Sequence, residues 1–390
     1  MGLIEDIKND EALRNELFPV TAETVYMSHA GVTSLPKAAG DAMREFIYTG
    51  ERDNQESDAC LELVEDTRTV AAELIGSQAN EIALLGPTSL GLSLVANGLQ
   101  WEPGDEVVSY FDDYPANVYP WMALESKGVK YVELKTEYPG VITWDLLEKV
   151  LTAKTRLVSL ASCHFLGGFR IDVDTIGQRL HERGILFCVD GIQTIGAFPT
   201  SVEHVDFLSA DSHKWMLGPA AAGIFYVRKS LQKDLKPMLR GAYNVVTPEF
   251  IAQEDQRFYV GGRRFEPGMQ NLPGIIGMRA SLKLILDVGV DAISARLLEL
   301  RKRILGSLKP HGYELYVSEV DDNPELAPWR SAIVTLTHPT KDLRALYEEL
   351  KAKKILVSNR QNREGTKFIR LSPHFYNTEE EIDRVAEAMR

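Results

Sequence analysis

Short apolar segments rich in β-branched residues alternate with helical patterns between residue 24 and about residue 230. This alternation is typical of a mostly parallel β-sheet covered by helices on both faces. The predicted strands are Glu106–Tyr110, Leu157–Ala161, Ile185–Val189, Phe207–Ser209 and Gly223–Val227. We therefore predict an α/β fold, in which ligands bind at the carboxyl ends of the parallel strands.

The chain divides into an N-terminal helix and two domains. Residues 1–20 are predicted to form the helix, residues 21–262 the large domain and residues 263–390 a smaller α+β domain. The boundary is marked by glycine and proline breaks, after which one long helix is predicted from about Pro273 to Leu308. Beyond it, strands are predicted near Ser331–Leu336, Ile355–Val357 and Lys367–Leu371, and helices near Lys341–Lys353 and Thr378–Met389.

Charge and composition exclude several classes of protein. The 56 acidic residues outnumber the 43 basic ones, and there is no basic run that would bind a nucleic-acid backbone. The 3 cysteines lack metal-ligand spacing and fit a reducing compartment. The chain shows no signal peptide and no apolar stretch of membrane-spanning length. We expect a soluble, cytoplasmic protein without a metal or membrane partner.

An acid and a lysine follow two neighbouring predicted strands. Asp190 ends one strand and Lys214 lies just beyond the next, so both side chains are expected in one crevice. Pyridoxal 5′-phosphate needs a lysine amine for its Schiff base and a carboxylate that keeps its pyridine nitrogen protonated. The pair fits both needs. A surface lysine and an aspartate that caps a helix would give the same spacing.

A second segment offers a phosphate site. Thr88 and Ser89 open a predicted helix after a Gly-Pro break. The free N–H groups at a helix start, together with two hydroxyls, suit a phosphate group. Capping of the helix by one hydroxyl, without any ligand, is the alternative.

Four further segments are informative together: Gly184–Gln193, Ser212–Pro219, Arg264–Gly268 and Ile369–Thr378. In this order along the chain, they resemble the class V aminotransferase family of fold-type I pyridoxal-phosphate enzymes. The resemblance implies a large domain with a seven-stranded, mostly parallel sheet, pyridoxal 5′-phosphate as cofactor, a small-molecule amino-acid substrate and a homodimer.

The resemblance also implies roles for individual residues. Lys214 would carry the cofactor as a Schiff base, and Asp190 would pair with its pyridinium nitrogen. Gln193 would hydrogen-bond the phenolic oxygen. Thr88, Ser89 and His213 would hold the phosphate.

Three further residues are expected in the site by the same resemblance. Tyr114 would stack on the cofactor ring, His164 would lie near the phenolic oxygen, and Arg370 would bind the substrate α-carboxylate through its guanidinium fork. A core tyrosine, a structural histidine and a solvated arginine are the respective alternatives.

Two positions depart from the family pattern. Asp211 replaces a hydroxyl residue beside the phosphate site, so we expect its carboxylate to turn toward a backbone donor or a basic side chain. Met269 replaces the threonine that reaches the neighbouring subunit's phosphate in relatives, which leaves that contact open or moved to Gln270 or Asn271.

The reaction is less constrained than the cofactor. A cysteine desulfurase carries its nucleophilic cysteine on the loop that corresponds to residues 357–365, and this chain has none there. An aminotransferase is the nominal prediction. A cysteine or cystine C–S lyase, another β-eliminating lyase and an epimerase are the alternatives, and a non-catalytic cofactor-binding protein is a further one. Arg360 and Arg363 would favour an acidic side chain on the substrate if they do not face solvent.

Overall fold

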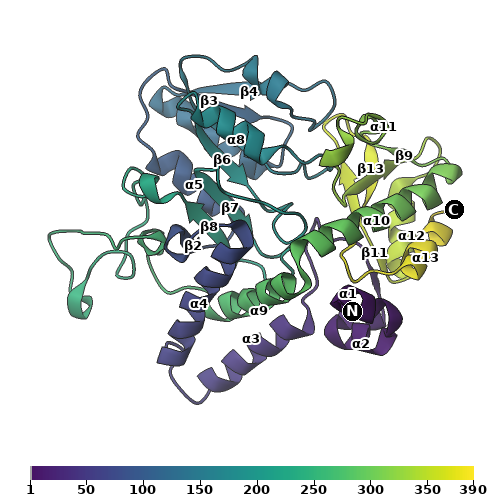
Figure 1. Ribbon diagram of the computed structural model, residues 1–390, viewed down its shortest axis with the longest axis horizontal. Coiled ribbons are helices and arrows are strands. Elements are labelled where there is room, and N and C mark those ends of the chain that lie inside the picture. The colour runs from purple at the N-terminus through teal and green to yellow at the C-terminus, as the bar shows by residue number, and fades with distance from the viewer. Residues whose placement is uncertain (1) are drawn as a thin grey trace.

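A seven-stranded sheet forms the body of the large domain in the computed structural model, which describes residues 2–390 (Figure 1). Its strand order is β2-β8-β7-β6-β5-β3-β4. The strands are β2 (Ile82–Leu84), β3 (Glu106–Tyr110), β4 (Lys130–Leu134), β5 (Thr155–Ala161), β6 (Leu186–Asp190), β7 (Phe207–Asp211) and β8 (Gly223–Val227). Only β8 runs antiparallel to its neighbours, so the prediction of a mostly parallel sheet is confirmed.

Successive side chains of the central strands enter two different apolar clusters. Val107 of β3 and Leu157 of β5 pack in one cluster, whereas Val108 and Val158 pack in the other. Side chains of a strand alternate between the two faces of its sheet, so both faces are covered. The covering helices are α3 (Lys37–Gly50), α4 (Asp58–Ile75), α5 (Thr88–Gly98), α6 (Tyr119–Met122), α7 (Trp144–Glu148), α8 (Val173–His181) and α9 (Leu272–Val288).

The smaller body has an antiparallel sheet of order β12-β13-β10-β9 (Figure 1). Its strands are β9 (Glu314–Leu315), β10 (Val334–Thr337), β12 (Ser358–Gln361) and β13 (Lys367–Leu371). Its helices are α10 (Val290–Leu308), α11 (Glu319–Asp322), α12 (Leu343–Ala352) and α13 (Glu379–Met389). A separate apolar cluster joins α10, α12 and α13 to this sheet.

The predicted helix from Pro273 to Leu308 is in fact two helices. Gly289 has a φ of 86°, a left-handed conformation that favours glycine, and it separates α9 from α10. Helix α9 packs on α3 and α4 beside the large sheet, and α10 leads into the smaller body (Figure 1). The chain therefore passes between the two bodies at Gly289, later than the predicted boundary near residue 262.

The N-terminal segment is also divided. Asp10 caps α2 (Glu11–Leu17) by accepting a hydrogen bond from the Leu13 N–H, and this ends α1 (Leu3–Asn9). Arg14 of α2 forms a buried ion pair of 3.0 Å with Glu381. The chain then pairs β1 (Val25–Tyr26) with β11 (Ile355–Leu356) and crosses into the large domain.

None of the helices in residues 2–390 is long and apolar enough to cross a membrane.

Candidate active site

One cavity of about 880 Å³ lies between the carboxyl edge of the large sheet and the smaller body. Residues that follow β6 and β7 line one side, and the start of α5 lines it too. Strands β12 and β13 supply the opposite wall. The charged and polar lining residues that concern the chemistry are Thr88, Ser89, Asp113, Tyr114, Asn117, Asp190, Gln193, His213, Lys214, Ser358, Arg360 and Arg370.

Asp190 and Lys214 both face this cavity, as the strand pattern predicts. Asp190 is 3% exposed, and its carboxylate accepts hydrogen bonds from the Asn117 side-chain amide at 2.9 Å and from the Ile192 N–H at 3.0 Å. Burial raises the pKa of Asp190. Burial lowers the pKa of Lys214 to about 8, although the nearby Asp190 charge opposes this shift. The cavity thus holds a reactive amine and an acid without a close ion-pair partner.

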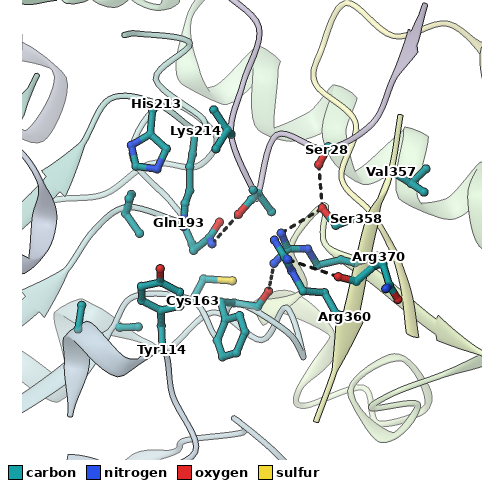
Figure 2. A pocket seen from close by; sticks show the side chains of 18 of the residues that line it. Ser28, Tyr114, Cys163, Gln193, His213, Lys214, Val357, Ser358, Arg360 and Arg370 are labelled. Atoms are coloured by element: carbon teal, nitrogen blue, oxygen red, sulfur yellow. Dashed lines mark hydrogen bonds between the residues drawn. The ribbon is translucent and has the colours of Figure 1, made fainter. Parts of the chain in front are cut away.

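Tyr114 faces the cavity from the loop after β3 (Figure 2). The Lys214 amine lies 5.6 Å from the centroid of its ring. The tyrosine is 52% exposed in the single chain and lines the cavity. This geometry suits the stacking role that the resemblance implies.

Gln193 is held in one orientation by a tryptophan. The indole N–H of Trp215 can only donate, and it donates to the Gln193 side-chain oxygen at 2.8 Å. The Gln193 amide nitrogen donates to the Ala30 carbonyl at 3.1 Å (Figure 2). One amide N–H therefore stays available to an acceptor in the cavity. Sequence reasoning placed Gln193 but missed Trp215, although Trp215 adjoins the lysine.

Thr88 and His213 are linked to each other through Asp211. Thr88 is the first residue of α5, and its hydroxyl accepts a hydrogen bond from the Asp211 N–H at 2.9 Å. The Asp211 carboxylate accepts from the Ala221 N–H at 3.2 Å and lies 3.0 Å from a ring nitrogen of His213. The prediction that Asp211 turns toward a backbone donor or a basic side chain is confirmed.

The amides suggested to replace the missing threonine are engaged within the chain. Gln270 donates to the Leu84 carbonyl at 3.0 Å, and Asn271 donates to the Ala221 carbonyl at 3.2 Å. Met269 itself is 57% exposed. Each side-chain amide keeps a second N–H, so the transfer of the phosphate contact to either residue stays a prediction.

The expected position of His164 in the site is wrong. Its neighbours Cys163 and Phe165 line the cavity, and the histidine between them points away. One ring nitrogen lies 3.1 Å from the Asp112 carbonyl, and the other accepts the Gly167 N–H at 2.9 Å. Both nitrogens are therefore used within the fold, so His164 is a structural histidine.

Buried histidines make the fold sensitive to acid. Burial lowers the pKa of His164 and of His374 to about 4, and that of His29 well below its usual value. Between pH 6.5 and 4 the unfolded chain binds more protons than the folded one, so stability is complete above pH 6.5 and falls on acidification. Each histidine contributes a slope of up to about 1.4 kcal/mol per pH unit.

We expect the His164→Asn variant to show a smaller loss of unfolding free energy between pH 7 and pH 4 than the unmodified protein. Denaturant unfolding across this range measures it. The exposed His311, changed to asparagine, is the control. An unchanged slope in His164→Asn would contradict this assignment.

Arg370 lies in the wall opposite Lys214 and is 1% exposed. Its guanidinium donates to the Phe165 carbonyl at 2.6 Å and to the Ser358 hydroxyl at 3.4 Å (Figure 2). Burial, with the nearby charge of Arg360, lowers its pKa to about 9. A buried guanidinium of this kind suits a carboxylate ligand.

A family model described as aminotransferase class V matches residues 25–385. The chain belongs to this family. Its members use pyridoxal 5′-phosphate, so the cofactor predicted from the sequence is confirmed.

The relatives of the chain differ in their named activities. A probable cysteine desulfurase of Pyrococcus abyssi is 28% identical across 98% of this chain and 96% of its own length. An uncharacterized aminotransferase of Bacillus subtilis is 26% identical across 95% of this chain and 96% of its own. The apo cysteine desulfurase of Thermococcus onnurineus has the same fold, with a TM-score of 0.88 and 24% identity over 100% of this chain and 98% of that one. The cystine C–S lyase C-DES follows with a TM-score of 0.84 and 22% identity over 95% and 98%.

The donor set of the cavity fits the family's cofactor. The Asp190 carboxylate is buried without a side-chain cation in hydrogen-bond contact, as a protonated ring nitrogen requires. His213 lines the cavity together with Thr88 and Ser89 at the start of α5, where a phosphate is favoured, and its Nδ1 is held 3.0 Å from the Asp211 carboxylate.

Proposed function

We propose that this class V family member is a pyridoxal-phosphate-dependent lyase that cleaves a C–S bond of an amino acid by β-elimination. One observation carries the proposal. The cavity joins Lys214, Asp190 and Arg370, while the segment opposite the lysine, residues 357–365, holds no thiol. The names of its relatives favour C–S chemistry, and the missing thiol disfavours the desulfurase route.

The cofactor, when bound, supplies an aldehyde that condenses with amines and a ring that withdraws electrons from Cα. Lys214 would serve as the attachment point and then as the base that takes the Cα proton, since its pKa of about 8 brings the neutral amine within reach near physiological pH. Asp190 would keep the ring nitrogen protonated, and Arg370 would bind the substrate α-carboxylate. Thr88, Ser89 and His213 would hold the phosphate, Gln193 would donate to the phenolic oxygen, and Tyr114 would stack on the ring.

The cysteines of the chain do not suit persulfide formation. Cys60 lies in α4, and Cys188 lies within the buried strand β6. Cys163 lines the cavity, but it is 0% exposed and burial raises its pKa to about 11. A nucleophilic cysteine needs an accessible thiolate. Elimination needs only a base at Cα and a leaving sulfur.

Aminotransfer is the second candidate. It uses the same lysine to move the Cα proton, and the Bacillus subtilis relative is named an aminotransferase. The homodimer expected from the resemblance stays a prediction. Exposed apolar side chains are available for such contacts at Phe250, Ile251, Val260 and Met269.

Product analysis separates the two reactions. The loaded enzyme is incubated with S-substituted cysteines, without any oxo acid. In elimination the Cα proton is lost and the Cβ–S electron pair leaves with sulfur as a thiol, and the remainder hydrolyses to pyruvate and ammonia. We expect equal amounts of thiol, pyruvate and ammonia over many turnovers. One turnover that yields the oxo acid of the intact substrate would instead establish aminotransfer.

A further inference from the structure

Arg360 lies beside Arg370 on the cavity face of the small sheet. Ser358 of β12 is paired with Arg370 of β13, so their side chains share one face of the sheet. Arg360 is two residues beyond Ser358 and therefore points to the same face. Both arginines line the cavity, and Figure 2 shows their guanidinium groups close together.

Neither guanidinium has an acidic partner. Among residues 2–390, no carboxylate lies within ion-pair distance of Arg360 or Arg370. Within the described part of the chain, the Arg360 guanidinium donates only to the Asn359 carbonyl, at 3.4 Å. Two like charges side by side repel each other, and partial burial strengthens the repulsion. Such a pair is stabilised by an anionic ligand.

The surrounding charges keep this wall cationic. Arg344 and Lys351 of α12 also line the cavity, and the acid between them, Glu348, is paired with Arg344 at 3.2 Å. The other lining acids, Asp113 and Asp190, act on the Lys214 charge at the opposite side. Fields of one sign in a cleft concentrate ligands of the other sign.

A nearby arginine provides the contrast. Arg363, three residues further along, is 57% exposed at its side chain and forms an ion pair with Asp112. Of the two arginines that sequence analysis left open, one is therefore neutralised at the surface and the other faces the substrate cavity. The planar guanidinium fork of Arg370 is enough to bind one α-carboxylate. Arg360 is therefore available to bind a second anionic group.

We infer that Arg360 binds an anionic group at the far end of the substrate from its α-carbon. The substrate class is then a cysteine derivative whose sulfur substituent ends in a carboxylate or a sulfonate. This inference rests on the proposed lyase function for its choice of sulfur substituent, and on the unpaired guanidinium for the anion.

A matched pair of substrates tests the inference. S-Carboxymethylcysteine and S-carbamoylmethylcysteine have nearly the same shape, but only the first carries the distal charge. We expect Arg360→Met to lower kcat/KM for the carboxylate by about 10- to 100-fold, as for a lost hydrogen bond to a charged group, and to change it for the amide by less than about threefold. Arg363→Met is the control, which should affect neither substrate. An equal loss on both substrates would overturn the inference, because Arg360 would then act on the shared α-carboxylate.

Calorimetry provides a readout that needs no reaction. The loaded enzyme is titrated with glutarate and with its monoamide, glutaramate. We expect Arg360→Met to weaken glutarate binding by about 10-fold or more and to leave glutaramate nearly unchanged. Glutarate affinity that is unaffected by the substitution would overturn the inference. If no pyruvate forms from any substrate while glutarate binding still depends on Arg360, the lyase proposal fails and the anion site stands. The visible absorbance of the bound cofactor and the melting temperature establish that each variant is folded and loaded.

Discussion

Replacement of Lys214 by alanine is expected to lower kcat by about 10⁴-fold or more, because in the proposed mechanism this one side chain supplies both the covalent attachment and the base at Cα. The structure places this amine in the cavity with Asp190 and Arg370, at 8% exposure. Pyruvate release measures the loss, and the visible absorbance of the protein reports the attachment.

An exposed lysine outside the cavity is the control for the Lys214→Ala variant. Lys233→Ala should retain both the absorbance and the rate, since its side chain lies at the surface away from the cavity. Turnover by Lys214→Ala at the rate of the unmodified enzyme would mean that another group is the base.

The Asp190→Asn variant is expected to lose about 100- to 1,000-fold in kcat, the size of effect seen when a preorganised electrostatic contact is removed from an active site. The substitution keeps the shape of the side chain but removes the charge that we propose holds the ring nitrogen protonated. It also sets an amide donor against the Asn117 amide, which now donates to Asp190 at 2.9 Å.

Steady-state kinetics measure the effect of the lost charge on kcat. Cofactor titration measures the effect of the opposed amide groups on cofactor binding. Asp172→Asn is a matched control, because Asp172 caps α8 and asparagine caps helices equally well. If Asp190→Asn kept full kcat, a neutral ring nitrogen would suffice and the role given to Asp190 would be wrong.

Periodic patterns predicted the central strands well. β3, β8 and β13 begin and end at the predicted residues, because each is a short segment rich in β-branched and aromatic residues. β4 (Lys130–Leu134) was not predicted, since it lies at the sheet edge and carries partly exposed polar residues. The break at Gly289 was missed because apolar periodicity continues on both sides of it.

The location of a candidate residue could be predicted when its position along a strand determines the direction of its side chain. Asp190 ends β6, and Lys214 follows β7 at the same edge of the sheet. His164 was misplaced because its direction depends on a local turn that links Cys163 to Arg170. Arg360 could not be assigned from the sequence, because only the pairing of β12 with β13 shows which face it occupies.

The most direct test of the proposed site is to locate the cofactor on the chain. Borohydride treatment of the loaded enzyme makes a lysine–cofactor link permanent, and mass spectrometry of the digested protein then identifies the modified lysine. The proposed site predicts the added mass on the peptide that contains Lys214. Added mass on a different lysine, or on none, would contradict it.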